Sequence, residues 1–291
     1  MRKQLFRLLS RLPFGVLYCI SDFIYLVLYY IVGYRKRVVR MNLKNAFPEK
    51  NEKELRQIEK GFYHFLCDYG VESLKLLTIS PEEMKEHMVF ENTEAIDDAL
   101  NDHNFVFVYI GHYCNWEWMS SLPLWARKDA TLGELYRPLK SKVMDELFID
   151  LRQHFNAECI SKYEALRHIM RFKAENKKCI IGFVADQTPH PDNTHLWMDF
   201  LSQDTPIFTG TERIGKKVDA AIFFADLYRV KRGHYRCTFK EITRNIKQFP
   251  DYQITERCTQ ELEQIICRQP EYWLWSHKRW KHKRNKNALA E

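Results

Sequence analysis

The sequence predicts an α/β fold with a mostly parallel central sheet flanked by helices, preceded by an N-terminal membrane-associating helical segment. Apolar, β-prone runs alternate with amphipathic helical patterns from about residue 51 onward. Hydrophobic residues make up 45% of the 291 residues and glycine only 10 of them, which excludes disordered and collagen-like chains. No proline- or glycine-rich linker divides this part of the chain. We therefore expect an N-terminal segment over residues 1–40 and one domain over residues 41–291.

The N-terminal segment contains an apolar stretch, residues 14–34, whose only formal charge is Asp22. About twenty apolar residues cross a bilayer, but the uninterrupted part, residues 23–33, is shorter. Four basic residues precede this stretch and four follow it within residues 35–40, so the positive-inside rule gives no orientation. A helix in the membrane interface, a spanning helix and a buried core helix all remain open, and the first two place the protein at a membrane.

The body of the chain alternates between two periodicities. Helical segments repeat apolar residues three and four apart, and strands are continuous apolar runs such as FVFVYI. Continuous runs indicate strands buried on both faces, as in parallel sheets. The expected helices cover residues 52–77, 92–102, 141–155, 163–175, 209–217 and 254–267, and the expected strands cover residues 105–110, 157–160, 179–185, 220–230 and 235–242.

The segment that follows the strand 105–110 reads GHYCNWEW and contains the first candidate site. Ligands of such sheets bind beyond the carboxyl ends of the strands. His112 and Glu117 would lie on different sides of one continuous helix, but they can meet if His112 lies in the turn and Glu117 in the first helical turn, with Asn115 as the N-cap. A carboxylate beside an imidazole makes a general base. A purely structural hydrogen bond is the alternative.

Several segments, taken in order, carry a family resemblance. They are RMNLKNAFPEK at 40–50, the His-x4-Glu turn, YRP at 136–138, VADQ at 184–187 and QPEYWLWSHKRWK at 269–281. Together they resemble the late acyltransferases of lipid A biosynthesis, in the lysophospholipid acyltransferase superfamily. The resemblance covers nearly the whole chain, although Ala185 stands where that family has a proline.

The resemblance implies transfer of a fatty acyl chain from acyl carrier protein to a hydroxyl of a lipid A precursor, at the cytoplasmic face of the bacterial inner membrane. It implies no cofactor and no metal, with acyl-ACP or acyl-CoA as the donor substrate. An acyltransferase of another membrane lipid (a lysophospholipid, an aminolipid or a glycosylated lipid) is the alternative. A non-catalytic protein that binds membranes or nucleic acid through the basic residues 277–286 is a further one, but no RNA-binding motif is present and we expect no nucleic acid.

The resemblance also assigns roles to individual residues. His112 and Glu117 form the base pair, and Arg137 and Arg152 bind the oxyanion or an acceptor phosphate. Asp186, at the end of the strand 179–185, is the place of a functional carboxylate, although a helix or loop cap is the other interpretation.

Three further patterns have weaker interpretations. A metal at Asp186, His190 and His195, and a nucleophilic role for Cys114, are weak hypotheses. Trp273, Trp275 and Trp280 lie beside many cations, a composition typical of an anionic membrane interface. The eight cysteines form no Cys-x-x-Cys pair, which indicates reduced thiols.

Overall fold

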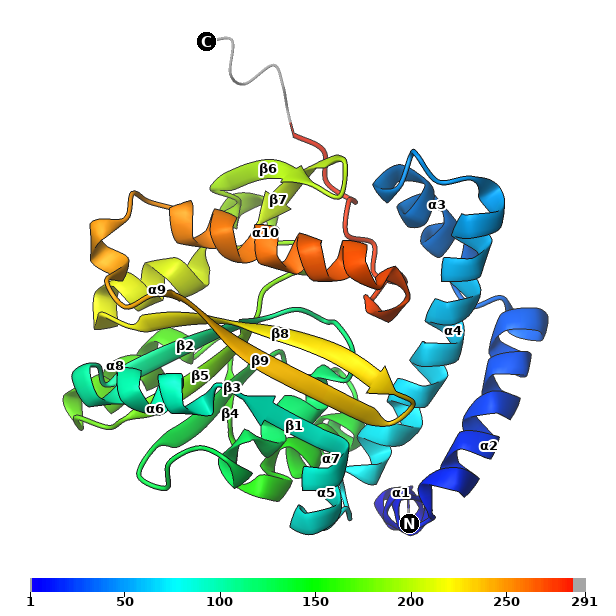
Figure 1. Ribbon diagram of the computed structural model, residues 1–291, viewed down its shortest axis with the longest axis horizontal. Helices are drawn as coiled ribbons and strands as arrows, with labels where there is room; N and C mark the ends of the chain where they lie inside the picture. The colour runs from blue at the N-terminus through cyan, green and yellow to red at the C-terminus, as the bar shows by residue number, and fades with distance from the viewer. Residues whose placement is uncertain (1, 285–291) are drawn as a thin grey trace.

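The computed structural model describes residues 2–284. A seven-stranded sheet forms its centre, with helices around it (Figure 1). The strand order is β1-β9-β8-β2-β5-β3-β4. All neighbouring strands pair in parallel except β8 and β9, which form an antiparallel hairpin. The strands are β1 (Met88–Glu91), β2 (Phe105–Ile110), β3 (Thr131–Tyr136), β4 (Glu158–Ser161), β5 (Cys179–Val184), β8 (Ala221–Lys231) and β9 (His234–Thr243). The predicted mostly parallel α/β fold is confirmed.

Strand β2 lies in the middle of the sheet, and all six of its residues are buried. Side chains on one face, such as Tyr109, meet α9 (Gly210–Val218) and α10 (Gln253–Arg268). Side chains on the other face, such as Val108, meet the 3₁₀ segment η2 (Trp116–Leu124). This double burial explains why the strand reads as a continuous apolar run.

The other predicted helices lie where the apolar periodicity placed them. They are α4 (Glu52–Lys75), α6 (Thr93–Asp102), α7 (Lys142–Arg152), extended by the 3₁₀ turn η3 (Gln153–Phe155), and α8 (Ala165–Ala174). Helix α4 begins with a capping box, because Asn51 accepts from the backbone of Glu54 while Glu54 accepts from that of Asn51. This reciprocal cap fixes the start of the longest helix.

Some elements are not predicted by the sequence patterns. These are β1, β3, α5 (Pro81–His87), the short 3₁₀ turns η4 (Pro191–Asn193), η5 (Ile246–Gln248) and η6 (Pro270–Tyr272), and the hairpin of β6 (Leu196–Phe200) and β7 (Gln203–Ile207). The strands among these elements are short and of mixed polarity and lack a clear period, so the sequence pattern does not predict them.

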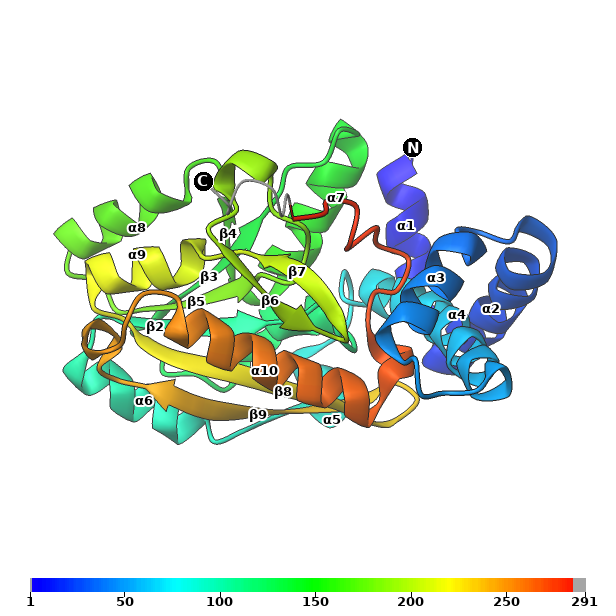
Figure 2. The same cartoon turned by 90° about the horizontal axis from the view of Figure 1, so that it is seen from above.

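The N-terminal part forms a layer of helices packed beside α4 (Figure 2). It consists of α1 (Arg2–Ser10), α2 (Phe14–Leu26), the π-helical turn η1 (Val27–Val32) and α3 (Lys36–Ala46). Together α2 and η1 give 19 continuous residues with a mean hydropathy of 1.8, long and apolar enough to cross a membrane. Phe23, Ile31 and Val32 are exposed on their outer side. The predicted membrane-associating segment is therefore present.

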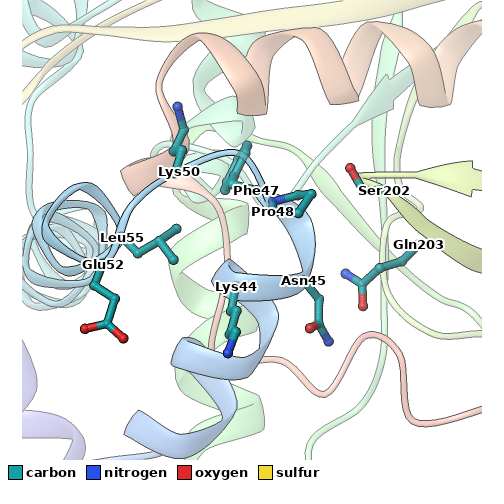
Figure 3. A pocket seen from close by; sticks show the side chains of 9 residues that line it. All are labelled: Lys44, Asn45, Phe47, Pro48, Lys50, Glu52, Leu55, Ser202 and Gln203. Atoms are coloured by element: carbon teal, nitrogen blue, oxygen red, sulfur yellow. The ribbon is translucent and has the colours of Figure 1, made fainter.

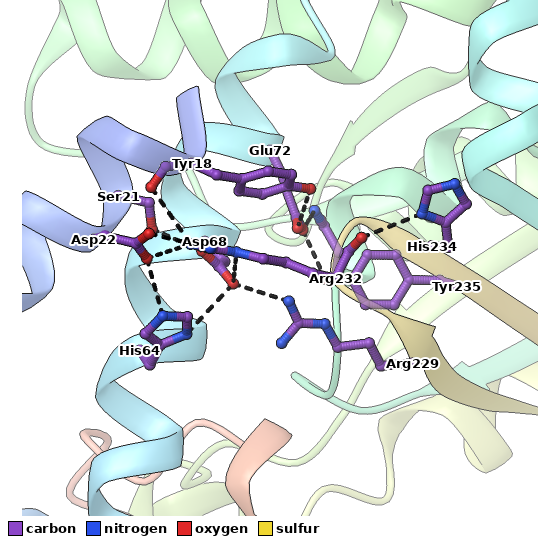
Figure 4. A network of polar contacts seen from close by, with 11 residues as sticks. Tyr18, Ser21, Asp22, His64, Asp68, Glu72, Arg229, Arg232, His234 and Tyr235 are labelled. Carbon is purple, nitrogen blue, oxygen red and sulfur yellow. Dashed lines mark hydrogen bonds and ion pairs between the residues drawn. The ribbon is translucent and has the colours of Figure 1, made fainter. Parts of the chain in front are cut away.

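A group of charged side chains fastens this layer to the sheet (Figure 4). This anchor cluster consists of Asp22 from α2, His64 and Asp68 from α4, and Arg229 and Arg232 from the β8–β9 hairpin. Asp68 is fully buried and lies 2.8 Å from Arg229 and 2.6 Å from Arg232. Asp22 lies 2.5 Å from Arg232. The ion pairs hold the inner side of α2 against the domain and leave its apolar outer side free.

Candidate active site

His112 lies in the turn directly after β2, at the carboxyl edge of the sheet. Its Nδ1 is 2.5 Å from Oδ1 of Asp186, and its backbone N–H donates to Oδ2 of the same carboxylate at 3.0 Å. Asp186 follows β5, which pairs with β2 in parallel. The two residues meet because parallel neighbours end at the same edge.

The Asp186 carboxylate is buried and accepts a third hydrogen bond, from Nε1 of Trp273 at 2.8 Å. Burial opposes its ionisation, but the charge of His112 and the hydrogen bonds outweigh burial and lower the pKa of Asp186 to about 2. An ionised carboxylate only accepts, so the proton of the neutral imidazole is on Nδ1. Nε2 is then an acceptor, and the side-chain nitrogen of Gln187 lies 3.0 Å from it.

The expected contact between His112 and Glu117 is wrong for this structure. The Glu117 carboxylate is held by Arg152, whose Nε and Nη2 donate to its two oxygens at 2.8 Å each. Tyr69 and Trp116 also donate to Glu117. A guanidinium matches a carboxylate as a planar fork, so this bidentate pair occupies both oxygens.

Asn115 is at the N-cap position of η2, as expected, but its side chain makes no capping hydrogen bond. The turn contains Cys114 at a φ of 49° and continues as 3₁₀ helix, with Pro123 inside it. The Asn115 amide is buried and donates to Glu72 of α4 at 3.0 Å. Asn115 therefore links the turn after β2 to α4.

A second carboxyl group lies beside Arg152. Glu134 of β3 is 3.9 Å from Arg152, and its Oε1 is enclosed without a hydrogen-bond partner among residues 2–284. Burial raises the pKa of Glu134 to about 8. Glu134 lines an apolar cavity between the sheet and η2, together with Val108, Met119 and Leu132. This carboxyl group is consequently protonated at neutral pH.

The other predicted site residues lie apart from this centre. Arg137 is exposed in the loop after β3, and no ion pair involves it within the described part of the chain. His190 pairs with Asp192 at the surface. Cys114 is fully buried, and burial raises the pKa of its thiol well above the ordinary range, which argues against a nucleophile.

One His/Asp/Glu group among the described residues has metal-ligand spacing, but it lies elsewhere. It is formed by Asp22, His64 and Asp68 of the anchor cluster. The guanidinium of Arg232 contacts both of these carboxylates, so a protein cation already balances their charge.

Residues 269–284 form a C-terminal strap across the site. Trp273 and Trp275 are buried, so the expectation that they face a membrane is wrong. Their indole N–H groups donate to Asp186 and to the Pro270 carbonyl. Asn42 of α3 donates to the strap at the Trp275 carbonyl, 2.8 Å away. The even spacing of Trp273, Trp275 and Arg279, all of which are buried, is the sequence signal for a segment that turns one side toward the interior. Lys286, predicted as part of the basic tail, lies outside the described residues.

A separate open hollow lies between the α3–α4 connection and the β6–β7 turn (Figure 3). Lys44, Asn45, Phe47 and Gln203 are among the residues that line it. None of its lining residues contacts His112 or Asp186 through the hydrogen bonds described above. The hollow is therefore distinct from the His112 centre.

Fold and site together define an α/β enzyme that presents a carboxylate-bound imidazole at the carboxyl edge of a parallel sheet. The model of one protein family, described as bacterial lipid A biosynthesis acyltransferase, matches residues 4–282. The chain belongs to this family and is an acyltransferase, as the sequence segments predicted. No curated protein matches the chain.

Proposed function

We propose that the protein transfers a fatty acyl chain from acyl carrier protein to a hydroxyl of a lipid A precursor, with His112 as the general base. The observation that carries this proposal is the His112–Asp186 contact of 2.5 Å, which orients the imidazole and leaves Nε2 as the acceptor. Asp186 takes the supporting role that we first expected of Glu117.

The reaction requires His112 first to accept a proton from the acceptor hydroxyl and then to donate a proton to the leaving thiolate. The acceptor oxygen attacks the thioester carbonyl carbon while Nε2 of His112 takes the hydroxyl proton. The carbonyl oxygen becomes an oxyanion, the carbon–sulfur bond then breaks, and the leaving thiolate receives the proton from the imidazolium. The buried negative charge of Asp186 stabilises the imidazolium between these steps. Gln187 must move from Nε2 or share it with the acceptor hydroxyl.

The two predicted arginines differ in what they offer to an anion. Arg152 is committed to Glu117 by two short hydrogen bonds. Arg137 is exposed at the same edge of the sheet and has its guanidinium free of ion pairs within residues 2–284. We therefore assign Arg137 to the phosphate of the acceptor or the oxyanion, and Arg152 to the positioning of η2 through Glu117.

The exposed apolar side of α2 and η1 supports work at the cytoplasmic face of the inner membrane. Basic side chains at Arg35, Lys36 and Arg37 follow this apolar side directly. Apolar area combined with adjacent cations binds anionic lipid surfaces.

Mass spectrometry of the product tests the proposal. Purified protein with acyl-ACP and a lipid A precursor should add the mass of one acyl chain. His112→Ala should reduce the rate by about 10³-fold or more. The control His168→Ala, which changes a histidine of α8 that pairs with Glu158 of β4, should not reduce it. Full activity of His112→Ala would refute the role of His112. If cells lacking the protein have unchanged lipid A and another altered lipid, the acceptor is that other lipid.

A further inference from the structure

Arg279 of the strap is a buried cation that lacks a direct counter-charge. Its exposure is 1%, and its one side-chain hydrogen bond runs from Nη2 to the Pro206 carbonyl at 2.6 Å. Its Nε and Nη1 have no partner among the residues that the structure describes, and no carboxylate there lies within ion-pair distance. An isolated buried charge destabilises the folded state unless an opposite charge nearby compensates it.

The cavity beside Arg279 identifies the balancing charge. Asp186 and Arg279 line it together, and Asp186 is the only acidic residue among its described lining residues. The remaining lining is mainly apolar, from residues such as Ile110, Phe200 and Leu262. The cavity has about 30 Å³ of free space, which admits one or two water molecules and is too small for a phosphate group. Arg279 therefore faces Asp186 across a low-dielectric gap.

The backbone of the strap fixes this arrangement. The Arg279 carbonyl accepts a hydrogen bond from Oγ1 of Thr188 at 2.7 Å, two residues after Asp186. The indole of Trp280 donates to Thr205 of β7. The loop that carries Asp186 and the segment that carries Arg279 are thus tied directly to each other.

The charges around the imidazole come from few groups. His277 of the strap faces Asp186 and His112, and burial lowers its pKa to about 4, so it is neutral at pH 7. Lys281 is exposed and acts on His277 from outside. On the other side, Trp116 packs on His112, and the Glu117–Arg152 pair behind it has no net charge.

Gln187, which lies at Nε2 of the imidazole, and Trp273, which donates to Asp186, are uncharged. Among the described residues, Asp186 and Arg279 are then the buried charges near the imidazole that make no ion pair with an oppositely charged acidic residue, lysine or arginine. With both present, a neutral imidazole leaves the site without net charge, and a protonated imidazole gives it an excess positive charge.

We propose that Arg279 is a positioning residue for the reaction at His112: its buried guanidinium balances Asp186 across the cavity, so that the imidazole stays unprotonated and can act as a base. Without Arg279, Asp186 would instead retain a proton on His112 to neutralise its own charge. The proposal rests on the proposed function, because it assumes that the imidazole accepts the hydroxyl proton.

The test compares Arg279→Met, which removes the charge, with Arg279→Lys, which keeps it, in the full-length protein. The acid limb of the kcat/KM–pH profile should move up by about one pH unit in Arg279→Met, giving about tenfold lower activity below that limb and recovery above it. Arg279→Lys should keep the wild-type limb. Lys278→Met, which removes an exposed charge next to Arg279, should leave the profile unchanged.

A second measurement follows the imidazole without acyl transfer. NMR titration of ¹³C-labelled histidine, assigned with His112→Gln, should show the same upward shift in Arg279→Met. A uniform loss of activity at every pH with an unchanged His112 titration would overturn the proposal and leave Arg279 a structural role. If wild type fails to acylate any lipid but the His112 titration shifts, the charge balance stands and the proposed function fails. Should Arg279→Met not fold, Arg279→Gln replaces it in both measurements.

Discussion

In two places in the molecule a histidine lies beside a buried aspartate. The two places differ in which other side chains contact the aspartate carboxylate. In the anchor cluster, His64 lies 3.6 Å from Asp68, but Arg229 and Arg232 already contact that carboxylate directly. At the sheet edge, Asp186 accepts from His112 and Trp273, and no arginine of residues 2–284 touches it. A carboxylate whose oxygens and charge are already matched by guanidinium groups stabilises a neighbouring imidazolium only weakly. The pairing of residue types alone therefore does not define a base.

The largest effect is expected from a substitution that breaks the His112–Asp186 pair at the sheet edge. Asp186→Asn should slow acyl transfer by about 10²–10⁴-fold, because an amide neither stabilises the imidazolium nor fixes the tautomer. His64→Ala should leave the rate within about twofold, since Arg229 and Arg232 still hold Asp68. Initial rates with saturating donor measure both. Equal losses in the two variants would remove the distinction between the two places.

The second effect concerns stability and belongs to the anchor cluster. Asp68→Asn should lower the free energy of unfolding by about 3–5 kcal/mol, because it leaves two arginines facing each other without their shared carboxylate. Denaturant unfolding measures the change. Asp192→Asn, at an exposed aspartate, is the matched control and should change stability by less than about 1 kcal/mol. A change as small in Asp68→Asn would mean that the cluster does not hold the N-terminal layer.

A third prediction concerns the pH dependence of stability, which distinguishes a protonated buried acid, Glu134, from the ionised Asp186. Burial raises the pKa of Glu134 from 4.5 to about 8, so between these values the folded state keeps a proton that the unfolded state loses. This group therefore lowers stability as pH rises from 4.5 to 8, by about 1.4 kcal/mol per pH unit within that window. Glu134→Gln should remove that part of the slope in unfolding experiments at several pH values. An unchanged slope would show that Glu134 is ionised.

The smallest effect tests the outer side of the anchoring layer. Ile31→Asp should weaken binding to anionic vesicles by about tenfold or more, since 78% of this residue is exposed on η1 and a charge opposes its insertion. Its melting temperature should stay unchanged. Tyr163→Asp changes another exposed apolar residue, outside the N-terminal layer, and should not affect vesicle sedimentation. Equal losses in both variants would place the membrane contact elsewhere.

The sequence was sufficient for elements that have a strong period and for residues that end them. FVFVYI and CIIGFVA indicated β2 and β5, and their ends correctly placed His112 and Asp186 at the carboxyl edge of the sheet. The family resemblance was confirmed as well. What failed was the choice of partner for His112.

The wrong partner has a physical cause. Glu117 is near His112 in sequence, whereas Asp186 is 74 residues away and comes close only through the parallel pairing of β2 and β5. Local spacing contains no information on that pairing. Trp273 was misassigned for the same reason: an indole beside lysines suits a lipid surface, and only the folded chain provides a buried carboxylate for its N–H.

The strap also sets an order of events during synthesis. The apolar residues of α2 are synthesised well before Asp186, and Trp273 follows Asp186 by 87 residues. Until the strap has emerged, the carboxylate lacks its indole donor and its distant cation. The hydrogen-bond partners of the Asp186 carboxylate are therefore complete only after the strap has been synthesised, long after the apolar residues of α2.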